Sequence, residues 1–185
     1  GERSANPNIL RSLKLRMFRW CHLLADHIIS NSHENLKLIR SINPFLSNKK
    51  CHVIYNVINF GIWRPEEPEA ISKDPKFRLV VIASHRYLKN AKGLIQAVAL
   101  LSNFEKNKLL IDWYGGTGHD NSLKDSMSLV KQLELETIFT FHKPTNNIAN
   151  HVATANAVGL FSFYEGLPNA VCEGMAMGKI VISSK

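Results

Sequence analysis

Glu165 and Glu173 stand eight positions apart, one in a tight turn and the other on the helix predicted to follow that turn. The turn and the helix start comprise Glu165, Gly166, Leu167, Pro168 and Asn169. Proline has a preset φ at a helix start, and the first N–H groups and the helix dipole attract anions there. Gly166 lets the backbone approach a ligand closely. The two carboxylates are suited to accept hydrogen bonds from sugar and ribose hydroxyl groups rather than to contact phosphate.

A basic loop, Ser84–Gly93, follows the first strand predicted in this part of the chain. Arg86 offers a planar fork and Lys92 a compact charge, and both suit phosphate oxygens. In an open α/β sheet, ligands bind at the carboxyl ends of the strands. Alone, this segment could be an ordinary basic loop. Because it lies at the same predicted sheet edge as the Glu165 turn, a phosphate site is favoured.

Strands and helices alternate from residue 77 onward, which predicts an α/β fold with a doubly wound parallel sheet. Apolar, β-branched runs predict strands, and apolar residues at helical spacing predict helices. The predicted strands are residues 77–84, 109–114, 138–141, 157–163 and 179–184. The predicted helices are residues 92–104, 121–135, 148–155 and 169–177, with Gly178 placed to end the last of them.

The first sixty residues contain too few elements for an independent two-faced sheet. A basic helix at 11–19, a strand at 27–30, a helix at 34–41 and a strand at 52–55 are predicted there, before a Pro- and Glu-rich linker. We therefore predict the end of a preceding domain over residues 1–62, a linker over 63–76 and a ligand-binding domain over 77–185.

Composition bounds the function further. The chain has 185 residues, 45% of them hydrophobic and 21% charged, and its longest apolar runs are far too short to cross a bilayer. Its three cysteines show no metal or redox spacing, so a reducing, cytoplasmic location is the simplest prediction. The net charge of +8 suits nucleic acid, an anionic membrane or a phosphorylated ligand. No nucleic-acid-binding motif is present.

The basic helix at 11–19 has two interpretations. Arg11, Lys14, Arg16 and Arg19 alternate with apolar residues in a partly amphipathic pattern. Such a helix could lie on lipid headgroups, giving a peripheral membrane contact. A solvated helix face is the interpretation that we favour.

The segment from Glu165 to Glu173 resembles the E-x7-E motif of retaining glycosyltransferases with the GT-B architecture. The surrounding string, YEGLPNAVCEGMAMGKIVISS, is similar to the hallmark of the family 4 glycosyltransferases. Arg86 and Lys92 resemble the family's cations after the first strand of the donor domain. Residues 52–59 resemble the family's crossover segment between its two domains, and residues 24–32 are similar to the strand that precedes it, so the resemblance covers nearly the whole chain.

The resemblance implies a role for each matching residue. Arg86 and Lys92 would bind the donor diphosphate and neutralise the leaving group, and backbone donors from Gly166, Leu167, Pro168 and Asn169 would hold phosphate and sugar oxygens. Glu165 would lie by the transferred sugar and Glu173 would bind the ribose. The loop of His142, Lys143 and Pro144 would lie against the base. Family members often have glycine where His142 stands. The glycines at 115, 116 and 118 are similar to another loop near the donor.

The implied function is transfer of a sugar, with retention, from a nucleotide-sugar donor to a glycan or lipid-linked acceptor in cell-surface polysaccharide or lipopolysaccharide synthesis. The family's retention is explained by attack on the same face, so we assign Glu165 no nucleophilic role, although retaining hydrolases use one. Enzymes of this family generally need no metal, and the sequence has no Asp-x-Asp. We therefore expect no metal site and no cofactor besides the donor.

Two alternatives remain, and both keep a nucleotide-binding fold. Another GT-B enzyme, such as a nucleotide-sugar epimerase, would share the sheet and the diphosphate site but not the E-x7-E helix. A non-catalytic nucleotide- or carbohydrate-binding module would bind nucleoside diphosphate without turnover. In the family the acceptor site belongs mainly to the N-terminal domain. We therefore expect the chain to be a truncated enzyme that alone binds nucleotide sugar weakly and transfers nothing.

Overall fold

The computed structural model describes residues 10–65 and 75–184, which form two compact units. The first contains the described residues up to Val57, together with Tyr164–Pro168. The second contains the described residues from Ile58 to Phe163 and from Asn169 onward. Most of the predicted linker, residues 66–74, lies outside the described residues. No helix in the described ranges is both long enough and apolar enough to span a bilayer.

The first unit contains a two-stranded parallel sheet, β1 (Ile28–Ser30) and β2 (Cys51–Val53), connected through helix α2 (His33–Ile42). Ser32 caps α2 by accepting a hydrogen bond from the Asn35 N–H, and Ile28, Leu36, Ile39 and Leu46 form the core. The observed strand β2 is shorter than the strand predicted at 52–55, and it begins one residue earlier. The 3-10 turns η2 (Cys21–Leu24) and η3 (Asn48–Lys50) complete the unit.

Helix α1 (Leu13–Trp20) confirms the predicted basic helix, and none of its side chains is buried. Ser12 caps it through the Leu15 N–H. Leu13, Met17 and Phe18 are exposed among the basic residues. Both interpretations of this helix, a membrane-facing and a solvated one, stay predictions.

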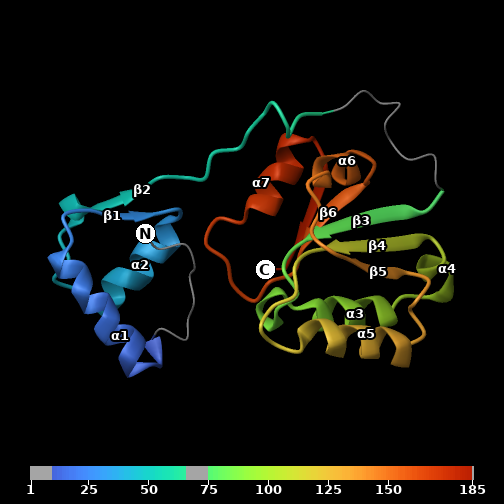
Figure 1. Ribbon diagram of the computed structural model, residues 1–185, viewed down its shortest axis with the longest axis horizontal. Helices are drawn as coiled ribbons and strands as arrows, with labels where there is room; N and C mark the ends of the chain where they lie inside the picture. Colours follow the sequence, from blue (N-terminus) through green and yellow to red (C-terminus); the bar gives the residue numbers. More distant parts are fainter. Residues whose placement is uncertain (1–9, 66–74, 185) are drawn as a thin grey trace. The chain divides into compact units, whose positions relative to one another are not determined.

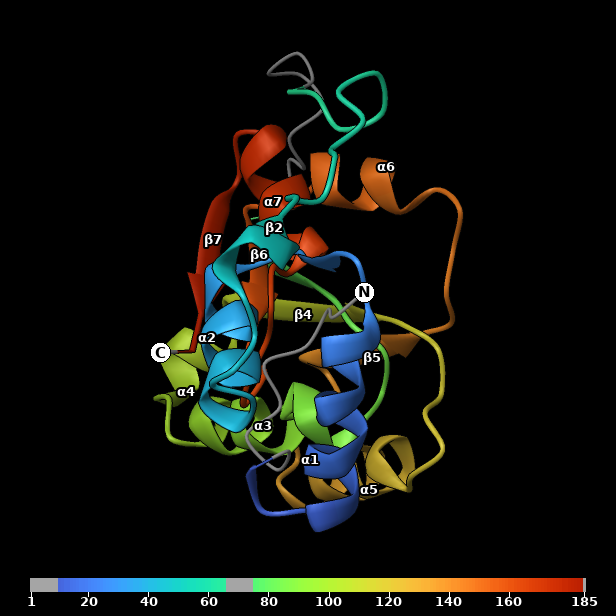
Figure 2. The same ribbon diagram turned by 90° about the vertical axis from the view of Figure 1, so that its left-hand side faces the viewer.

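The second unit confirms the predicted doubly wound parallel sheet. Its strand order is β5-β4-β3-β6-β7, and every pair is parallel. The strands are β3 (Phe77–Ile82), β4 (Leu109–Tyr114), β5 (Phe139–His142), β6 (Ala157–Leu160) and β7 (Ile180–Ser183). The sheet lies between two layers of helices (Figures 1 and 2). Neighbouring residues of a strand therefore face different cores: Val81 packs into one and Val80 into the other.

Helices α3 (Ala91–Ala99) and α5 (Ser122–Gln132) cover one face, and α6 (Ile148–Ala153) and α7 (Asn169–Ala176) the other (Figure 1). Leu94, Ile95, Val98 and Val130 fill the first core, and Val152, Ala153 and Met177 the second. At Gly174, a Cβ would lie 3.0 Å from Val158, so glycine lets α7 pack close to β6.

The single helix predicted at 92–104 is wrong, because the structure divides it into α3 and α4 (Asn103–Lys106). Ser102 accepts a hydrogen bond from the Glu105 N–H, and the Glu105 carboxylate accepts one from the Ser102 N–H at 2.8 Å. This capping box starts a new helix. Its Ser-x-x-Glu pattern is visible in the sequence but was outweighed by the apolar periodicity.

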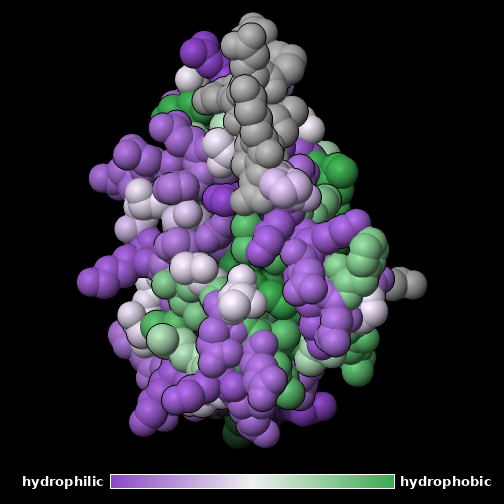
Figure 3. All heavy atoms as spheres, turned by 90° about the vertical axis from the view of Figure 1, so that its right-hand side faces the viewer, coloured by the Kyte–Doolittle hydropathy of each residue, from purple (hydrophilic) through white to green (hydrophobic). Residues whose placement is uncertain are grey.

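The end of the second unit that carries the amino ends of the strands is mostly hydrophilic, with hydrophobic residues gathered along its middle (Figure 3). Helix α4 lies at this end (Figure 1). It carries Phe104, which is 69% exposed and has the Lys108 Nζ 3.9 Å from its ring centroid. Arg86 and Lys92, the cations predicted to bind phosphate, follow β3 at the opposite, carboxyl end of the sheet.

Gly178 ends α7 with a φ of +67°, as the sequence predicted. Its N–H donates to the Met175 carbonyl, and the Lys179 N–H donates to the Gly174 carbonyl. We expect Gly178→Ala to lower the free energy of unfolding by about 1 kcal/mol, because this left-handed conformation strains a Cβ. No atom lies within 4 Å of that Cβ, so the cost is conformational only. Urea unfolding measures it. Gly178→Asn should cost less, and equal stability of the alanine and glycine forms would contradict this prediction.

Candidate functional site

The switch point of the sheet lies between β3 and β6, because β4 and β5 lie beyond one of these strands and β7 beyond the other. Ligands of doubly wound sheets bind at the carboxyl ends of such strands. The loops after β3 and β6 meet there. The Phe163 N–H donates to the Leu88 carbonyl at 2.9 Å, and the rings of Tyr87 and Phe163 lie 5.2 Å apart between centroids.

The glycine-rich loop after β4 packs directly on the loop after β3. The His85 N–H donates to the Gly116 carbonyl at 2.8 Å, and the Gly118 N–H donates to the His85 carbonyl at 3.0 Å. A Cβ on Gly115 would lie 1.9 Å from the Ala83 carbonyl oxygen. At Gly115, glycine is therefore required by the contact between two loops of the protein itself.

Arg86 and Lys92, the two predicted phosphate-binding cations, line one pocket of about 340 Å³. The other lining residues are Tyr87, Asn90, Ala91, Gly93, Gln96, Ser122, Asp125, Ser126 and Phe163. Asn90 adopts a left-handed conformation with a φ of 54° and caps α3 by accepting the Gly93 N–H at 3.1 Å. Lys92 thus lies in the first turn of α3, where the helix dipole repels a cation. An anion bound in this pocket would be attracted to the helix start and to both cations.

Asp120 holds the Arg86 loop in place, a role that we did not predict from the sequence. Its carboxylate accepts hydrogen bonds from the Tyr87 N–H at 3.0 Å and the Ser122 N–H at 3.2 Å. The hydrogen bond from Tyr87 is the largest cause that lowers the pKa of Asp120, followed by that of Ser122. An aspartate two residues before a helix is the sequence signal that could have identified it.

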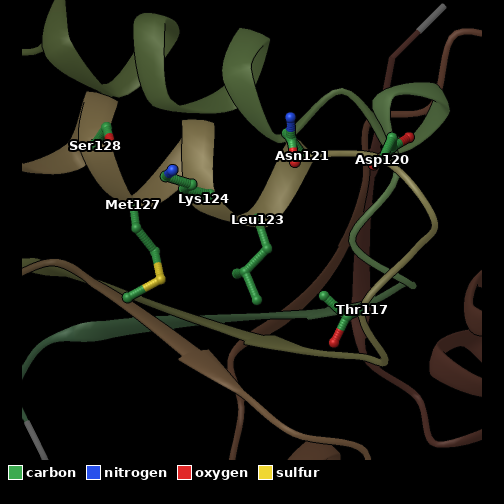
Figure 4. A pocket seen from close by; sticks show the side chains of 7 residues that line it. All are labelled: Thr117, Asp120, Asn121, Leu123, Lys124, Met127 and Ser128. Carbon is green, nitrogen blue, oxygen red and sulfur yellow. The ribbon is translucent and has the colours of Figure 1, made fainter.

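A second pocket, of about 410 Å³, also includes Asp120 but contains neither Arg86 nor Lys92. The remaining lining residues are Thr117, Asn121, Leu123, Lys124, Met127 and Ser128 (Figure 4). Figure 4 shows Leu123 and Met127 pointing the same way from α5. The lining carries a single basic side chain, so the first pocket suits a diphosphate better.

His142 is held by contacts with other side chains of the protein. Its Nε2 lies 2.6 Å from Asp112 Oδ1, and its ring stacks on Tyr114 at 4.3 Å between centroids. Tyr114 also stacks on His151, and Arg78 lies 3.5 Å from the other oxygen of Asp112. Burial, followed by the charge of Asp112, raises the pKa of Tyr114. Among the three predicted base-contacting residues, Lys143 and Pro144 are the exposed ones. The Asp112 cluster follows from strand register and has no local sequence signal.

Glu173 lies half-buried on α7, and burial raises its pKa. Within residues 10–65 and 75–184, no hydrogen bond or ion pair involves its carboxylate, so both oxygens can accept hydrogen bonds from a ligand. Burial also raises the pKa of the neighbouring Cys172 thiol, and the charge of Glu173 adds to this effect.

Glu165, Gly166, Leu167 and Pro168 belong to the first unit, whereas Asn169 begins α7 in the second. The Asn56 Nδ2 donates to the Leu167 carbonyl at 3.2 Å. The structure therefore brings Arg86 and Lys92 into one pocket and places Asn169 and Glu173 on α7 of the same unit. The ligand-binding roles of all these residues stay predictions.

His85 gives the second unit a predicted sensitivity to acid. It is 3% exposed and lies against Trp113 and Phe141. Burial lowers the pKa of His85 below its ordinary 6.5, and a hydrogen bond with the His142 backbone opposes this in part. The unfolded chain thus binds a proton there more readily than the folded chain, so the free energy of unfolding falls as the pH drops below about 6.5.

The variant His85→Gln tests this sensitivity. Urea unfolding between about pH 7.5 and pH 5.5 should show a smaller loss of stability for the variant than for the unmodified chain. His119→Gln, which changes an exposed histidine, is the control and should keep the original pH dependence. Parallel pH profiles for all three proteins would show that His85 does not cause the effect.

Two comparisons of the amino-acid sequence relate this chain to known proteins. A family model described as "Glycosyl transferases group 1" matches residues 64–185. The N-acetylgalactosamine-N,N'-diacetylbacillosaminyl-diphospho-undecaprenol 4-alpha-N-acetylgalactosaminyltransferase of Campylobacter jejuni is 31% identical over 160 residues, which are 85% of this chain and 41% of that protein.

Solved structures resemble the chain in fold. Anabaena Alr3699/HepE in complex with UDP and glucose has a TM-score of 0.84 at 19% identity, over 98% of this chain and 50% of that one. The lipopolysaccharide outer core galactosyltransferase WaaB, in its apo form, has a TM-score of 0.68 at 18% identity, over 95% of this chain and 46% of that one. The chain thus spans half or less of these proteins' lengths.

Proposed function

Because the chain belongs to the glycosyl transferases group 1 family, as its motifs predicted, we propose that its second unit binds the nucleotide-sugar donor of a glycosyltransferase. The reaction would transfer a sugar, with retention, to a glycan or lipid-linked acceptor. The observation that carries this proposal is the single pocket lined by Arg86 and Lys92 at the start of α3. It lies at the carboxyl end of the sheet, beside the switch point.

The charges of this pocket fit the chemistry of donor cleavage. Breaking a sugar–phosphate bond builds negative charge on the departing diphosphate and positive charge on the sugar ring. Arg86 and Lys92 would stabilise the diphosphate together with the N–H groups at the start of α3, because preorganised charges need no rearrangement during the reaction. These groups would do the work of charge neutralisation without a cofactor, and the sequence has no Asp-x-Asp with which to hold a metal.

The remaining predicted residues would hold the rest of the donor. The half-buried carboxylate of Glu173 would accept hydrogen bonds from the ribose. Glu165 would lie by the transferred sugar, and the backbone of 166–169 would bind phosphate and sugar oxygens. Because His142 is occupied by Asp112, the base would contact Lys143, Pro144 or the backbone of that loop.

The relatives support a donor base and an acceptor class. HepE is described in complex with UDP and glucose, so we propose a UDP-sugar donor. The Campylobacter relative is named for transfer to a diphospho-undecaprenol-linked sugar, and we propose an acceptor of this lipid-linked kind. Synthesis of cell-surface polysaccharide or lipopolysaccharide would use such acceptors.

A thermal-shift screen of the 185-residue chain with UDP-, GDP- and ADP-sugars tests the donor proposal. A ligand at about 100 times its dissociation constant adds about 2.7 kcal/mol of stability. For a chain of this size, that raises Tm by about 5–11 °C. We expect the UDP-sugar to give the largest rise. The donor proposal fails if no nucleotide sugar raises Tm at millimolar concentration.

A further inference from the structure

Two exposed aromatic rings stand beside the cationic pocket. Tyr87 is 73% exposed and Phe163 is 53% exposed, and their planes meet at 37° with centroids 5.2 Å apart. Both line the pocket with Arg86 and Lys92. Large aromatic side chains left exposed at the mouth of a pocket are typical of binding sites.

The backbone under both rings is fixed by the protein. The Phe163 N–H donates to the Leu88 carbonyl, and the Tyr87 N–H donates to the Asp120 carboxylate. The acceptor of the first bond, Leu88, lies in the loop after β3, and the acceptor of the second, Asp120, lies in the loop after β4. Since the rings are already positioned, a ligand stacked on them would order little additional chain on binding.

The lining of the same pocket also offers hydrogen-bonding groups. Ser126 is 4% exposed and lines the pocket, so its hydroxyl belongs to the pocket wall. A hydroxyl group in a pocket wall can both donate a hydrogen bond to a ligand and accept one from it. Gln96 and Asp125 line the pocket as well and add an amide and a carboxylate. These groups match the hydroxyl groups of a carbohydrate.

We propose that this pocket is a pyranose-binding subsite in which Tyr87 and Phe163 form a stacking platform and Ser126, Gln96 and Asp125 bind sugar hydroxyl groups. A pyranose ring presents C–H groups on its faces, which the negative face of an aromatic ring attracts, and hydroxyl groups around its rim. This inference rests on the proposed function, since Arg86 and Lys92 would place the diphosphate at the edge of the subsite.

The bound ring would come from the donor or from the acceptor, and three titrations of the 185-residue chain distinguish them. The ligands are UDP alone, UDP-glucose, and a neutral glucose oligosaccharide in the presence of UDP. The variants are Tyr87→Ala and Phe163→Leu, with Tyr87→Phe as the conservative change that keeps the ring. Phe104→Ala removes another exposed aromatic ring, which does not line this pocket and lies on α4 at the other end of the sheet, and serves as the control (Figure 1).

We expect Tyr87→Ala and Phe163→Leu each to weaken sugar binding about 2- to 12-fold, because one aromatic contact contributes about 0.5–1.5 kcal/mol. Binding of UDP alone should change less than about 2-fold, and Tyr87→Phe and Phe104→Ala should behave like the unmodified chain. A loss confined to UDP-glucose assigns the subsite to the donor sugar, and a loss confined to the oligosaccharide assigns it to the acceptor.

Three results would overturn the subsite. The first is that the variants bind both sugar ligands as tightly as the unmodified chain does. The second is that the unmodified chain binds no sugar. The third is that the variants lose as much affinity for UDP alone as for UDP-glucose. The last result would place the nucleobase on the rings. Failure of the unmodified chain to bind UDP would instead contradict the proposed donor site, while the oligosaccharide, titrated without UDP, would still test the platform.

Discussion

Arg86→Ala is expected to weaken the binding of UDP by about 10- to 100-fold. A hydrogen bond to a charged group contributes about 1.5–3 kcal/mol, and each 1.4 kcal/mol is a factor of ten in affinity. Arg86 is exposed on the rim of the pocket, so its truncation should remove a ligand contact without opening the core. Isothermal titration with UDP measures the loss.

A second variant, Arg86→Lys, tests whether the shape of the arginine side chain matters as well as its charge. Arg86→Lys keeps the positive charge but loses the planar fork that can bind two phosphate oxygens at once. Its affinity should lie between those of the alanine variant and the unmodified chain. If lysine restores full affinity, charge alone accounts for the role of Arg86.

A matched control separates the pocket from the net charge of +8. Lys124→Ala removes the same charge from α5, outside the pocket of Arg86 and Lys92. Its UDP affinity should change less than about 2-fold at about 0.15 M salt, because Lys124 does not line that pocket and salt weakens the attraction of charges that make no direct contact. If Arg86→Ala and Lys124→Ala lost UDP affinity equally, the assignment of the site to Arg86 would be wrong. The net positive charge of the protein would then account for the binding of UDP.

Gly115→Ala is expected to lower the free energy of unfolding by about 2–4 kcal/mol. The new Cβ would lie 1.9 Å from the Ala83 carbonyl oxygen and 2.6 Å from its carbon, and both are backbone atoms that cannot rotate away. The loops after β3 and β4 must therefore separate, and overpacking of this kind is among the larger single-residue effects. Because the loop after β3, which Gly115 contacts, carries Arg86, UDP affinity should fall as well.

Gly116→Ala provides the neighbouring control. Its Cβ would meet Pro144 Cγ at 3.6 Å, an ordinary contact, and Gly116 has no positive φ. We expect a change within about 0.5 kcal/mol. Urea unfolding of both variants gives the difference. Similar stabilities of the two variants would mean that the close contact between the β3 and β4 loops is not rigid.

Much of the second unit was predictable because its signals are local. The apolar run at Phe77–Ile82 predicts a strand buried on both faces, and the alternation with helices predicts a parallel sheet. Gly178 marked the end of α7 because only glycine adopts its positive φ without strain. The Ser102–Glu105 capping box was an equally local signal. The prediction of one helix over 92–104 missed it because the apolar residues there keep a helical spacing.

The sequence by itself determined the family motif, the alternation of strands and helices, and the two cations after the first strand of the sheet. Only the tertiary structure decided that Arg86 and Lys92 line one pocket, that Asp120 holds their loop, and that His142 pairs with Asp112. The physical reason is that strand order and register, which set these contacts, depend on packing between segments far apart in the chain. Local patterns of residue type carry no record of that packing.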